Sequence, residues 1–225
     1  MDATVTSLSQ ARCSLTILAY EKLGELIVTL KLKPGSTHSE NDLRQLIGVG
    51  RTPVREALQR LSREGLVEIL PRKGINITQV GYEGGFLRVE LARTLLALMA
   101  RTSAVRATPE QKQAFADIAT SFDKIVQTPE LGLFMQCDKV MLNLLCEACH
   151  NEHVCRAMSM LASELRRIGY LHLQKHDDIA VYARIRAELA RALDRGDPEA
   201  AETIIHQRMD YIESTLKGRT RTSTK

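Results

Sequence analysis

The chain contains no tryptophan, and aromatic residues make up only 4% of its 225 residues. Proteins that bind single-stranded nucleic acid stack bases on aromatic rings, so this composition does not favour that class. No run approaches the roughly 18 consecutive apolar residues of a membrane span, and no charged and apolar signal opens the chain. The sequence therefore predicts a cytoplasmic protein without a membrane segment.

The motifs of common enzymes are also missing. The sequence has no phosphate-cradling glycine loop, no nucleophile elbow, and no histidine and carboxylate pair at a credible spacing. We therefore predict a protein that is not an enzyme.

Cysteine is present in an odd number, five, which favours free thiols in a cytoplasmic protein. One cluster, Cys146-Glu147-Ala148-Cys149-His150 followed by His153 and Cys155, matches the C-x-x-C-H pattern of haem c attachment. Haem c attachment requires an exported chain, so we predict no cofactor here. Zinc binding and redox sensing are the remaining alternatives for this cluster.

What the sequence does contain is an amphipathic helix with cations on one face. It follows Gly50, and its apolar positions are Val54, Ala57, Leu58 and Leu61, while its polar positions are Arg51, Thr52, Arg55 and Gln59. Thr52 is predicted as the N-cap and Pro53 as the first helical residue. Free backbone amides at such a helix end favour phosphate contact. The first 80 residues also carry 11 Lys and Arg against 8 Asp and Glu. This surplus is compatible with DNA but is not specific for it.

The neighbouring segments complete a DNA-binding unit. Ser39 and Asp42 form a predicted capping box before a short helix that Gly48 ends. An earlier amphipathic helix runs from Leu15 to Leu30, after about ten residues that we expect to be disordered. Two strands, 66–70 and 75–80, flank a turn at 71–74. The pattern predicts a winged helix-turn-helix over residues 12–80.

These residues resemble the GntR family of transcriptional regulators. The resemblance rests on Lys33-Pro34-Gly35, on Ser39 to Leu43, on Gly48 to Leu58, on Leu61, on Glu64 to Val67 and on Gly74. It implies double-stranded operator DNA as the partner. The predicted DNA contacts are Asn41, Gly50, Arg51, Thr52, Pro53, Arg55, Arg72, Lys73 and Gly74. The family usually carries Ser or Thr where this chain has Gly50, which implies a missing phosphate contact and an unusual operator.

Beyond Val80 the strand patterns disappear. Helical stripes are predicted at 86–104, 109–126, 130–148, 153–172, 178–194 and 198–216, and together they predict an all-helical domain over residues 83–217. This half resembles the FCD ligand-sensing bundle through Asp138, Asn151 and the segment from Ala192 to Ala201. The predicted fold is therefore mostly α, with a winged helix-turn-helix followed by an FCD-like bundle.

Three of these stripes carry a charge on their apolar face. Asp138 follows Phe134, Arg186 follows Tyr182, and Arg208 lies among Ile204, Ile205 and Ile212. An unpaired buried charge costs several kcal/mol, and one Asp neutralises only one Arg. A small carboxylate effector held by the arginine forks is one explanation. A structural ion network without a ligand is the other.

The resemblance adds a comparison with metal-binding relatives. Many FCD regulators hold a divalent metal with an Asp and three His, and these positions fall here on Asp138, Leu142, Arg186 and Arg208. Leucine and arginine do not ligate metals, so we predict no metal. The predicted effector-site residues are Asp138, Leu142, Arg186, Arg208 and Arg93, although Arg93 also suits a salt bridge at the bundle edge. His172, His176 and His206 match no compact metal site.

The resulting functional prediction is a transcription factor, most simply a repressor. A carboxylate effector in the bundle would change the geometry of paired DNA-binding heads, so a homodimer is predicted, with Leu87, Leu91, Leu95 and Leu98 as a candidate interface. The alternative is a small-molecule-binding or enzymatic protein whose winged helix mediates protein contact. Arg51, Arg55, Arg72 and Lys73 favour DNA, because a protein-contact winged helix does not need cations on both helix and wing.

Overall fold

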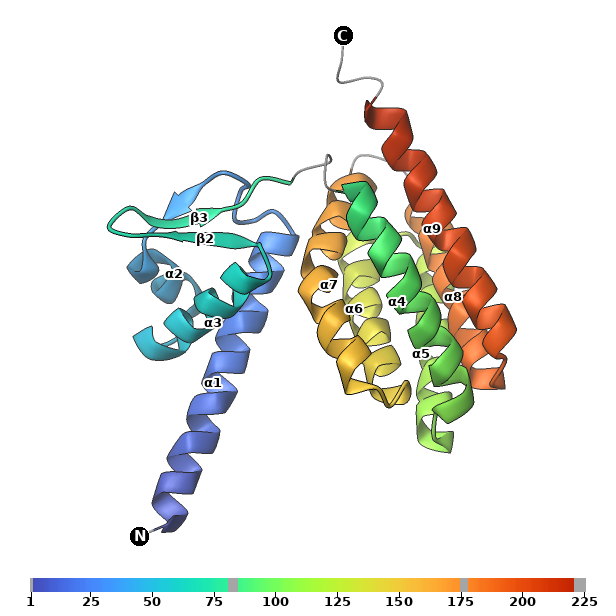
Figure 1. Ribbon diagram of the computed structural model, residues 1–225, viewed down its shortest axis with the longest axis horizontal. Coiled ribbons are helices and arrows are strands. Elements are labelled where there is room, and N and C mark those ends of the chain that lie inside the picture. Colours follow the sequence, from blue (N-terminus) through green and yellow to red (C-terminus); the bar gives the residue numbers. More distant parts are fainter. Residues whose placement is uncertain (1, 81–84, 175–177, 221–225) are drawn as a thin grey trace. The chain divides into compact units, whose positions relative to one another are not determined.

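The computed structural model describes residues 2–80, 85–174 and 178–220, with the side chains of 2–13, 85–86 and 215–220 left out. The chain divides into two compact units (Figure 1). The first contains the residues up to Val80 together with residues 162–171, and the second contains the remainder. Within the described ranges there are nine helices and three short strands.

The first unit is a winged helix-turn-helix, as predicted. Its helices are α1 (Asp2–Val28), α2 (Glu40–Ile47) and α3 (Arg51–Arg63), and its strands are β1 (Thr37–His38), β2 (Val67–Leu70) and β3 (Gly74–Ile77). The strands form an antiparallel sheet in the order β1-β3-β2. The sequence did not indicate β1, because two residues are too few to show an alternating pattern.

The predicted caps of α2 are confirmed. The Ser39 hydroxyl accepts a hydrogen bond from the backbone N–H of Asp42, and the Asp42 carboxylate accepts one from the backbone N–H of Ser39. At the other end Gly48 has φ of 67°, a left-handed conformation that glycine adopts without a Cβ clash. The capping box thus fixes the start of α2, and the left-handed Gly48 begins the tight turn between α2 and α3.

Two local predictions in this unit are wrong. α1 begins at Asp2, so residues 2–10 are helical rather than a disordered arm. The N-cap of α3 is Gly50 rather than Thr52, because the Gly50 backbone is extended and its carbonyl already accepts from Val54 N–H at 3.3 Å. Pro53 therefore lies two residues further into the helix, still in the first turn, where its missing N–H leaves no bond unmade.

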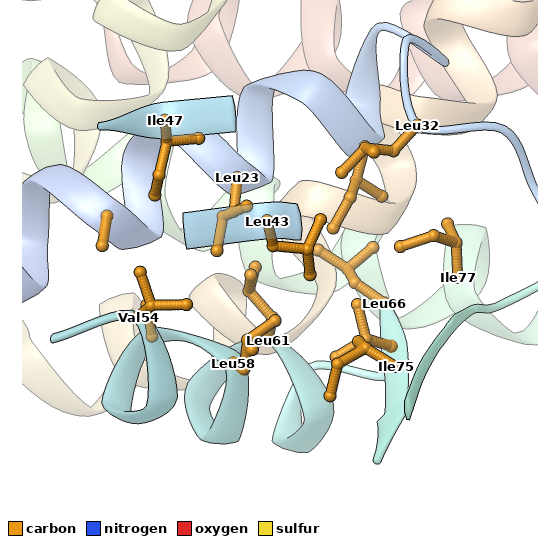
Figure 2. Packing of buried hydrophobic residues seen from close by; sticks show 14 of the residues in the cluster. Leu23, Leu32, Leu43, Ile47, Val54, Leu58, Leu61, Leu66, Ile75 and Ile77 are labelled. Carbon is orange, nitrogen blue, oxygen red and sulfur yellow. The ribbon is translucent and has the colours of Figure 1, made fainter. Parts of the chain in front are cut away.

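A single hydrophobic core holds the first unit together. Leu23 of α1, Leu43 of α2 and Leu58 and Leu61 of α3 meet Leu66 and the β3 residues Ile75 and Ile77 (Figure 2). Each of these side chains is at most 5% exposed. The face of α3 that carries Arg51 and Arg55 is thereby turned away from the core.

The second unit is all-helical, as the periodicity predicted. Its helices are α4 (Gly85–Arg106), α5 (Pro109–Gln127), α6 (Leu131–Ala148), α7 (Glu152–Leu173), α8 (Ile179–Arg195) and α9 (Pro198–Thr220). Residues 162–171 of α7 belong to the first unit. α5 packs along α8, α4 packs along α9, and α6 contacts α4, α5 and α8 (Figure 1). Gly196, the C-cap of α8, has φ of 70°, and Pro198 opens α9. No helix in the described residues is long and apolar enough to cross a membrane.

Candidate functional site

The recognition helix α3 separates an apolar face from a cationic face. Val54, Ala57 and Leu61 are fully buried. The side chains of Arg51 and Arg55 are 74% and 62% exposed, so the two guanidinium groups face solvent at the start of the helix. An arginine pair at the N-terminal end of a recognition helix is the arrangement that reads base edges in a major groove.

One carboxylate of α2 contacts both arginines. Glu40, in the first turn of α2, places Oε1 3.3 Å from Arg51 Nε and Oε2 3.3 Å from Arg55 Nε. The Glu40 side chain is only 25% exposed. The sequence did not reveal this contact, because it joins two helices through a tertiary arrangement rather than through helical spacing.

The other predicted contacts around α3 divide into exposed and buried positions. Thr52 and Asn41 are exposed, and the Asn41 amide oxygen accepts a hydrogen bond from Arg44 Nη2 at 2.9 Å. Gly50 is exposed and offers only its backbone. Pro53 is buried, so its side chain does not belong to the exposed face, and we leave it out of the candidate interface.

The wing presents its cations at the tip of the β2–β3 hairpin. Arg72 and Lys73 are exposed, and a Lys73 N–H to Leu70 carbonyl bond of 3.1 Å closes the turn. Arg72 has φ of 63°, a conformation that a turn of this kind requires and that a side chain rarely adopts. Gly74 has φ of 102°, and a Cβ there would lie 2.6 Å from the His38 carbonyl oxygen. Glycine at this position therefore lets β1 approach the wing.

A buried carboxylate at the far end of α3 joins that helix to α1. Glu64 accepts hydrogen bonds from the Tyr20 hydroxyl at 2.9 Å and from Arg60 Nε at 3.2 Å. The Arg60 guanidinium also lies 3.8 Å from the centre of the Tyr20 ring. Burial and the negative charge of Glu64 raise the pKa of Tyr20, which keeps the hydroxyl a donor. This cluster fixes the orientation of α3 on α1.

In the second unit, three charged side chains converge from three helices. Asp138 of α6 forms an ion pair with Arg186 of α8, and both residues are buried. Arg208 of α9 lies close enough to both that the charge of Arg186 lowers its pKa and the charge of Asp138 raises it. We call these three residues the charged layer. The helical spacing of the sequence predicted that they would face inward.

The charged layer has more donors than acceptors. Within the described parts of the chain, Arg186 Nε and Nη1 and Arg208 Nε are buried and meet no hydrogen-bond acceptor. Burial, together with the positive charge of Arg186, lowers the pKa of Arg208 to about 10, against the opposing effect of Asp138. The group remains a cation at neutral pH. Two guanidinium charges therefore face one carboxylate in a low-dielectric surrounding.

Aromatic rings lie one helical turn from the charged layer. Phe134 precedes Asp138 and Tyr182 precedes Arg186 by four residues, while Tyr211 follows Arg208 by three. The Tyr182 ring contacts Phe134 edge-on at a centroid distance of 6.3 Å and Tyr211 at 5.4 Å. These contacts join α6, α8 and α9 through aromatic side chains one turn from the charged layer.

The two remaining predicted residues have different surroundings. Leu142 lies one turn beyond Asp138 on α6 and is half-buried. Arg93 of α4 forms ion pairs with Asp210 at 2.7 Å and Glu213 at 2.8 Å, both on α9. These two carboxylates raise the pKa of Arg93, the Glu213 hydrogen bond having the largest effect. Arg93 is thus a bundle-edge salt bridge, and we leave it out of the effector site.

The residues of the charged layer do not fit a divalent metal. Asp138 is its single ligating side chain, since guanidinium groups offer no lone pair to a metal. Among the described residues, no three His, Cys, Asp or Glu side chains gather as a metal site. His172 is buried, with Nε2 3.2 Å from Asp178 Oδ2, and His206 is half-exposed beside Glu202. His176 lies outside the described residues.

The cysteine cluster lies where α6 ends and α7 begins. Cys137, Cys146, Cys149 and Cys155 are free thiols, as predicted, and the Cys149 and Cys155 sulfurs are 3.5 Å apart. Burial raises the pKa of the Cys146, Cys149 and Cys155 thiols. A raised pKa keeps these thiols protonated and less nucleophilic, which weakens the redox alternative.

Comparison with known families assigns both units. Residues 17–77 match the bacterial regulatory proteins of the gntR family, and residues 89–211 match the FCD domain. The chain belongs to the GntR family. It is a DNA-binding transcriptional regulator with a C-terminal effector-binding domain, and the alternative of a protein-contact winged helix is not favoured.

Individual relatives agree with this assignment. The HTH-type transcriptional repressor RspR of Escherichia coli K12 is 22% identical over 202 residues, which cover 88% of this chain and 87% of that protein. The Nta operon transcriptional regulator of Aminobacter aminovorans is 24% identical over 200 residues, covering 86% of this chain and 92% of that protein. A regulator in an unstable DNA locus of Streptomyces ambofaciens is 48% identical over 61 residues, only 27% of this chain and 26% of that protein.

Solved structures show the same fold. Escherichia coli McbR/YncC superposes with a TM-score of 0.78 at 17% identity, over 92% of this chain and 98% of that one. A GntR regulator from Rhodococcus sp. RHA1 gives a TM-score of 0.70 at 21% identity, over 92% of this chain and 99% of that one.

Proposed function

We propose that this regulator binds a double-stranded operator through α3 and the wing, and that a small carboxylate bound at the charged layer changes its operator affinity. Arg51 and Arg55 would read base edges, while Thr52, Gly50, Asn41 and the wing residues Arg72, Lys73 and Gly74 would lie near phosphates. The protein acts by binding and not by catalysis. Because it acts on operator DNA, we place it in the cytoplasm.

Repression is the direction of regulation that we propose. A relative that aligns along most of the chain, RspR, carries the name of a transcriptional repressor. A repressor needs only to occupy its operator, and effector binding then needs only to change the spacing of two DNA-binding heads.

A homodimer would supply the two heads. Leu87, Leu91 and Leu98 of α4 are 72%, 50% and 43% exposed, and they follow one side of the helix with half-buried Leu95 between them. Two winged helices related by a twofold axis read a palindrome and gain affinity through effective concentration. Sedimentation of a monomer at micromolar concentration, with and without DNA, would contradict this part of the proposal.

The effector proposal rests on one observation, the unsatisfied guanidinium N–H groups of Arg186 and Arg208. A carboxylate placed between them would accept those hydrogen bonds and cancel the excess positive charge. Fixed arginine charge then does what a bound metal does in related sensors, so effector binding is independent of metal.

The test measures operator affinity with a panel of small carboxylates. An operator duplex is selected from a random library with the parent protein, and its binding is followed by fluorescence anisotropy with and without EDTA. We expect one class of carboxylate to change the dissociation constant, and EDTA to leave that change intact. A stoichiometric metal that EDTA removes together with the response would overturn the metal-independent site.

The structural ion network is the competing function for the same three residues. It is favoured by the direct Asp138–Arg186 pair. It predicts no response to any carboxylate and a loss of stability when Arg208 is made apolar, whereas the effector proposal predicts a response and no such loss.

A further inference from the structure

The Glu40 carboxylate stands between the two candidate base-reading arginines. It contacts each guanidinium through Nε, with both distances at 3.3 Å. The contact to Arg55 is a hydrogen bond that Arg55 Nε donates. Because Arg51 and Arg55 are four residues apart on α3, one carboxylate of α2 spans a full helical turn and holds both.

The geometry of these contacts leaves the outer ends of both arginines available. A guanidinium has five N–H donors, and its two terminal nitrogens form the fork that pairs with guanine O6 and N7. Glu40 accepts the Nε–H of Arg55, and it lies beside Nε of Arg51 as an ion pair without a hydrogen bond. The terminal nitrogens stay on the solvent side, where the arginine side chains are 74% and 62% exposed.

Charge makes this arrangement unusual for a nucleic-acid surface. A carboxylate next to a phosphate backbone weakens general attraction to DNA, since affinity for any duplex depends on the net number of cations at the surface. The favourable effect of the carboxylate is that it orders the arginine side chains before DNA binds. A free arginine side chain samples many rotamers, and a side chain already fixed in one of them loses less freedom when it binds a base.

We propose that Glu40 is a positioning residue for sequence discrimination. It restricts the side chains of Arg51 and Arg55 to the position in which they contact Glu40 and remain mostly exposed, and it lowers affinity for DNA of any sequence. This inference rests on the proposed function of α3 as the base-reading helix.

The proposal has a signature that other roles for Glu40 do not share. Removing the carboxylate should tighten binding to a random duplex and weaken binding to the operator. A carboxylate that acted by charge alone would change both affinities in the same direction. Loss of folding would weaken both.

Glu40 is also separable from the capping of α2. The reciprocal capping bonds belong to Ser39 and Asp42, and neither uses the Glu40 side chain. Glu40→Ala and Glu40→Gln therefore leave the capping box intact. Glutamine keeps one acceptor oxygen but no charge, so it should retain part of the positioning.

A matched control removes a carboxylate elsewhere in the same unit. Glu68 of β2 is exposed and accepts a hydrogen bond from Asn76 of β3 at 3.0 Å. Glu68→Gln changes the net charge by the same amount as Glu40→Gln.

The experiment uses the full chain and two duplexes of equal length, the operator selected with the parent and a scrambled version of it. Anisotropy titrations give both dissociation constants for the parent, Glu40→Ala, Glu40→Gln, Glu68→Gln, and the Arg51→Ala and Arg55→Ala variants. For Glu40→Ala we expect scrambled-duplex affinity to rise about twofold and operator affinity to fall about tenfold. Glu40→Gln should lie between it and the parent, and Glu68→Gln should keep the parent's ratio.

The outcomes separate the two proposals. If Arg51→Ala and Arg55→Ala discriminate as well as the parent, α3 is not the reading helix and the proposed function is wrong. If those variants lose discrimination while Glu40→Ala keeps the parent's ratio, or moves both affinities alike, the role of Glu40 is wrong and α3 remains the reader. A melting curve for each variant checks folding. If Glu40→Ala is unfolded at the assay temperature, the result for Glu40→Gln decides the role of Glu40 instead.

Discussion

Arginine is used in opposite ways in the two units of this protein. Arg51 and Arg55 of the winged helix are mostly exposed, and a shared carboxylate holds them from one side. Arg186 and Arg208 of the bundle have buried nitrogen atoms with no acceptor in the described residues. An exposed guanidinium keeps its hydration and suits a long polyanion such as DNA, and the affinity of such binding depends strongly on salt concentration. A buried one has already lost its hydration, so it suits a small anion that arrives with matching acceptors.

The largest expected effect is the loss of the buried carboxylate. Asp138→Ala leaves two buried guanidinium groups without a counter-charge, which should destabilise the protein by about 3–5 kcal/mol. Urea unfolding followed by circular dichroism measures this, since the chain has no tryptophan.

The matched control for Asp138→Ala is the exposed pair of the same unit. Asp123 and Arg191 form an ion pair in which the side chains are 47% and 44% exposed. Asp123→Ala should change stability by only about 0–1 kcal/mol, because exposed pairs are screened by water. Equal effects of the two variants would remove the distinction between buried and exposed arginines.

Making Arg208 apolar should have a smaller effect of the opposite sign. Arg208→Met removes a cation whose Nε is buried without an acceptor, so the protein without anion should gain about 1–4 kcal/mol. The pKa of Arg208, lowered to about 10, gives the same sign. The unfolded chain binds a proton more tightly than the folded one, so stability rises with pH between about 10 and the ordinary arginine value and the penalty is present in full at neutral pH. Arg184, exposed on α8, supplies the control substitution Arg184→Met. A destabilised Arg208→Met protein would favour the structural ion network.

Substitutions of exposed cations in α3 and in the wing should affect DNA binding in different ways. Arg51→Ala should weaken operator binding by about 1–3 kcal/mol and relax the sequence preference, because a base-reading fork is lost. Lys73→Ala in the wing should weaken binding to every duplex alike and lower the salt slope by about 0.9. Titrations at several salt concentrations on operator and scrambled duplexes distinguish the two. Identical behaviour of both variants would mean that Arg51 contacts phosphate only.

Much of this comparison follows from the sequence. Helical periodicity and cap signals predicted each helix of the second unit to within a few residues, and the same periodicity placed Asp138, Arg186 and Arg208 on inward faces. The spacing fixes the face of a helix, but it does not say which partner that face meets. Arg93 shows this limit, because its stripe allowed both an effector-site position and a salt bridge at the bundle edge, and only the structure shows that Asp210 and Glu213 hold it at the edge.

The features that sequence reasoning missed depend on contacts between elements. Glu40 reaches Arg51 and Arg55 across the turn between α2 and α3, and no spacing rule connects residues on two helices. The Tyr20 and Glu64 pair joins residues 44 positions apart. The N-cap of α3 was misassigned because threonine is the better capping side chain. The short turn that begins at the left-handed Gly48 nevertheless places the backbone of Gly50 at the N-cap position.

The most direct test of the buried-arginine account is a melting experiment with small anions. The parent and Arg208→Met are heated with a panel of carboxylates and with inorganic phosphate, each with and without EDTA. The account predicts that at least one carboxylate stabilises the parent by about 2.7 kcal/mol at a hundredfold excess over its dissociation constant. It also predicts that EDTA leaves this gain intact and that Arg208→Met lacks it. A parent protein that no anion stabilises, or an Arg208→Met variant that gains as much as the parent, would contradict the account.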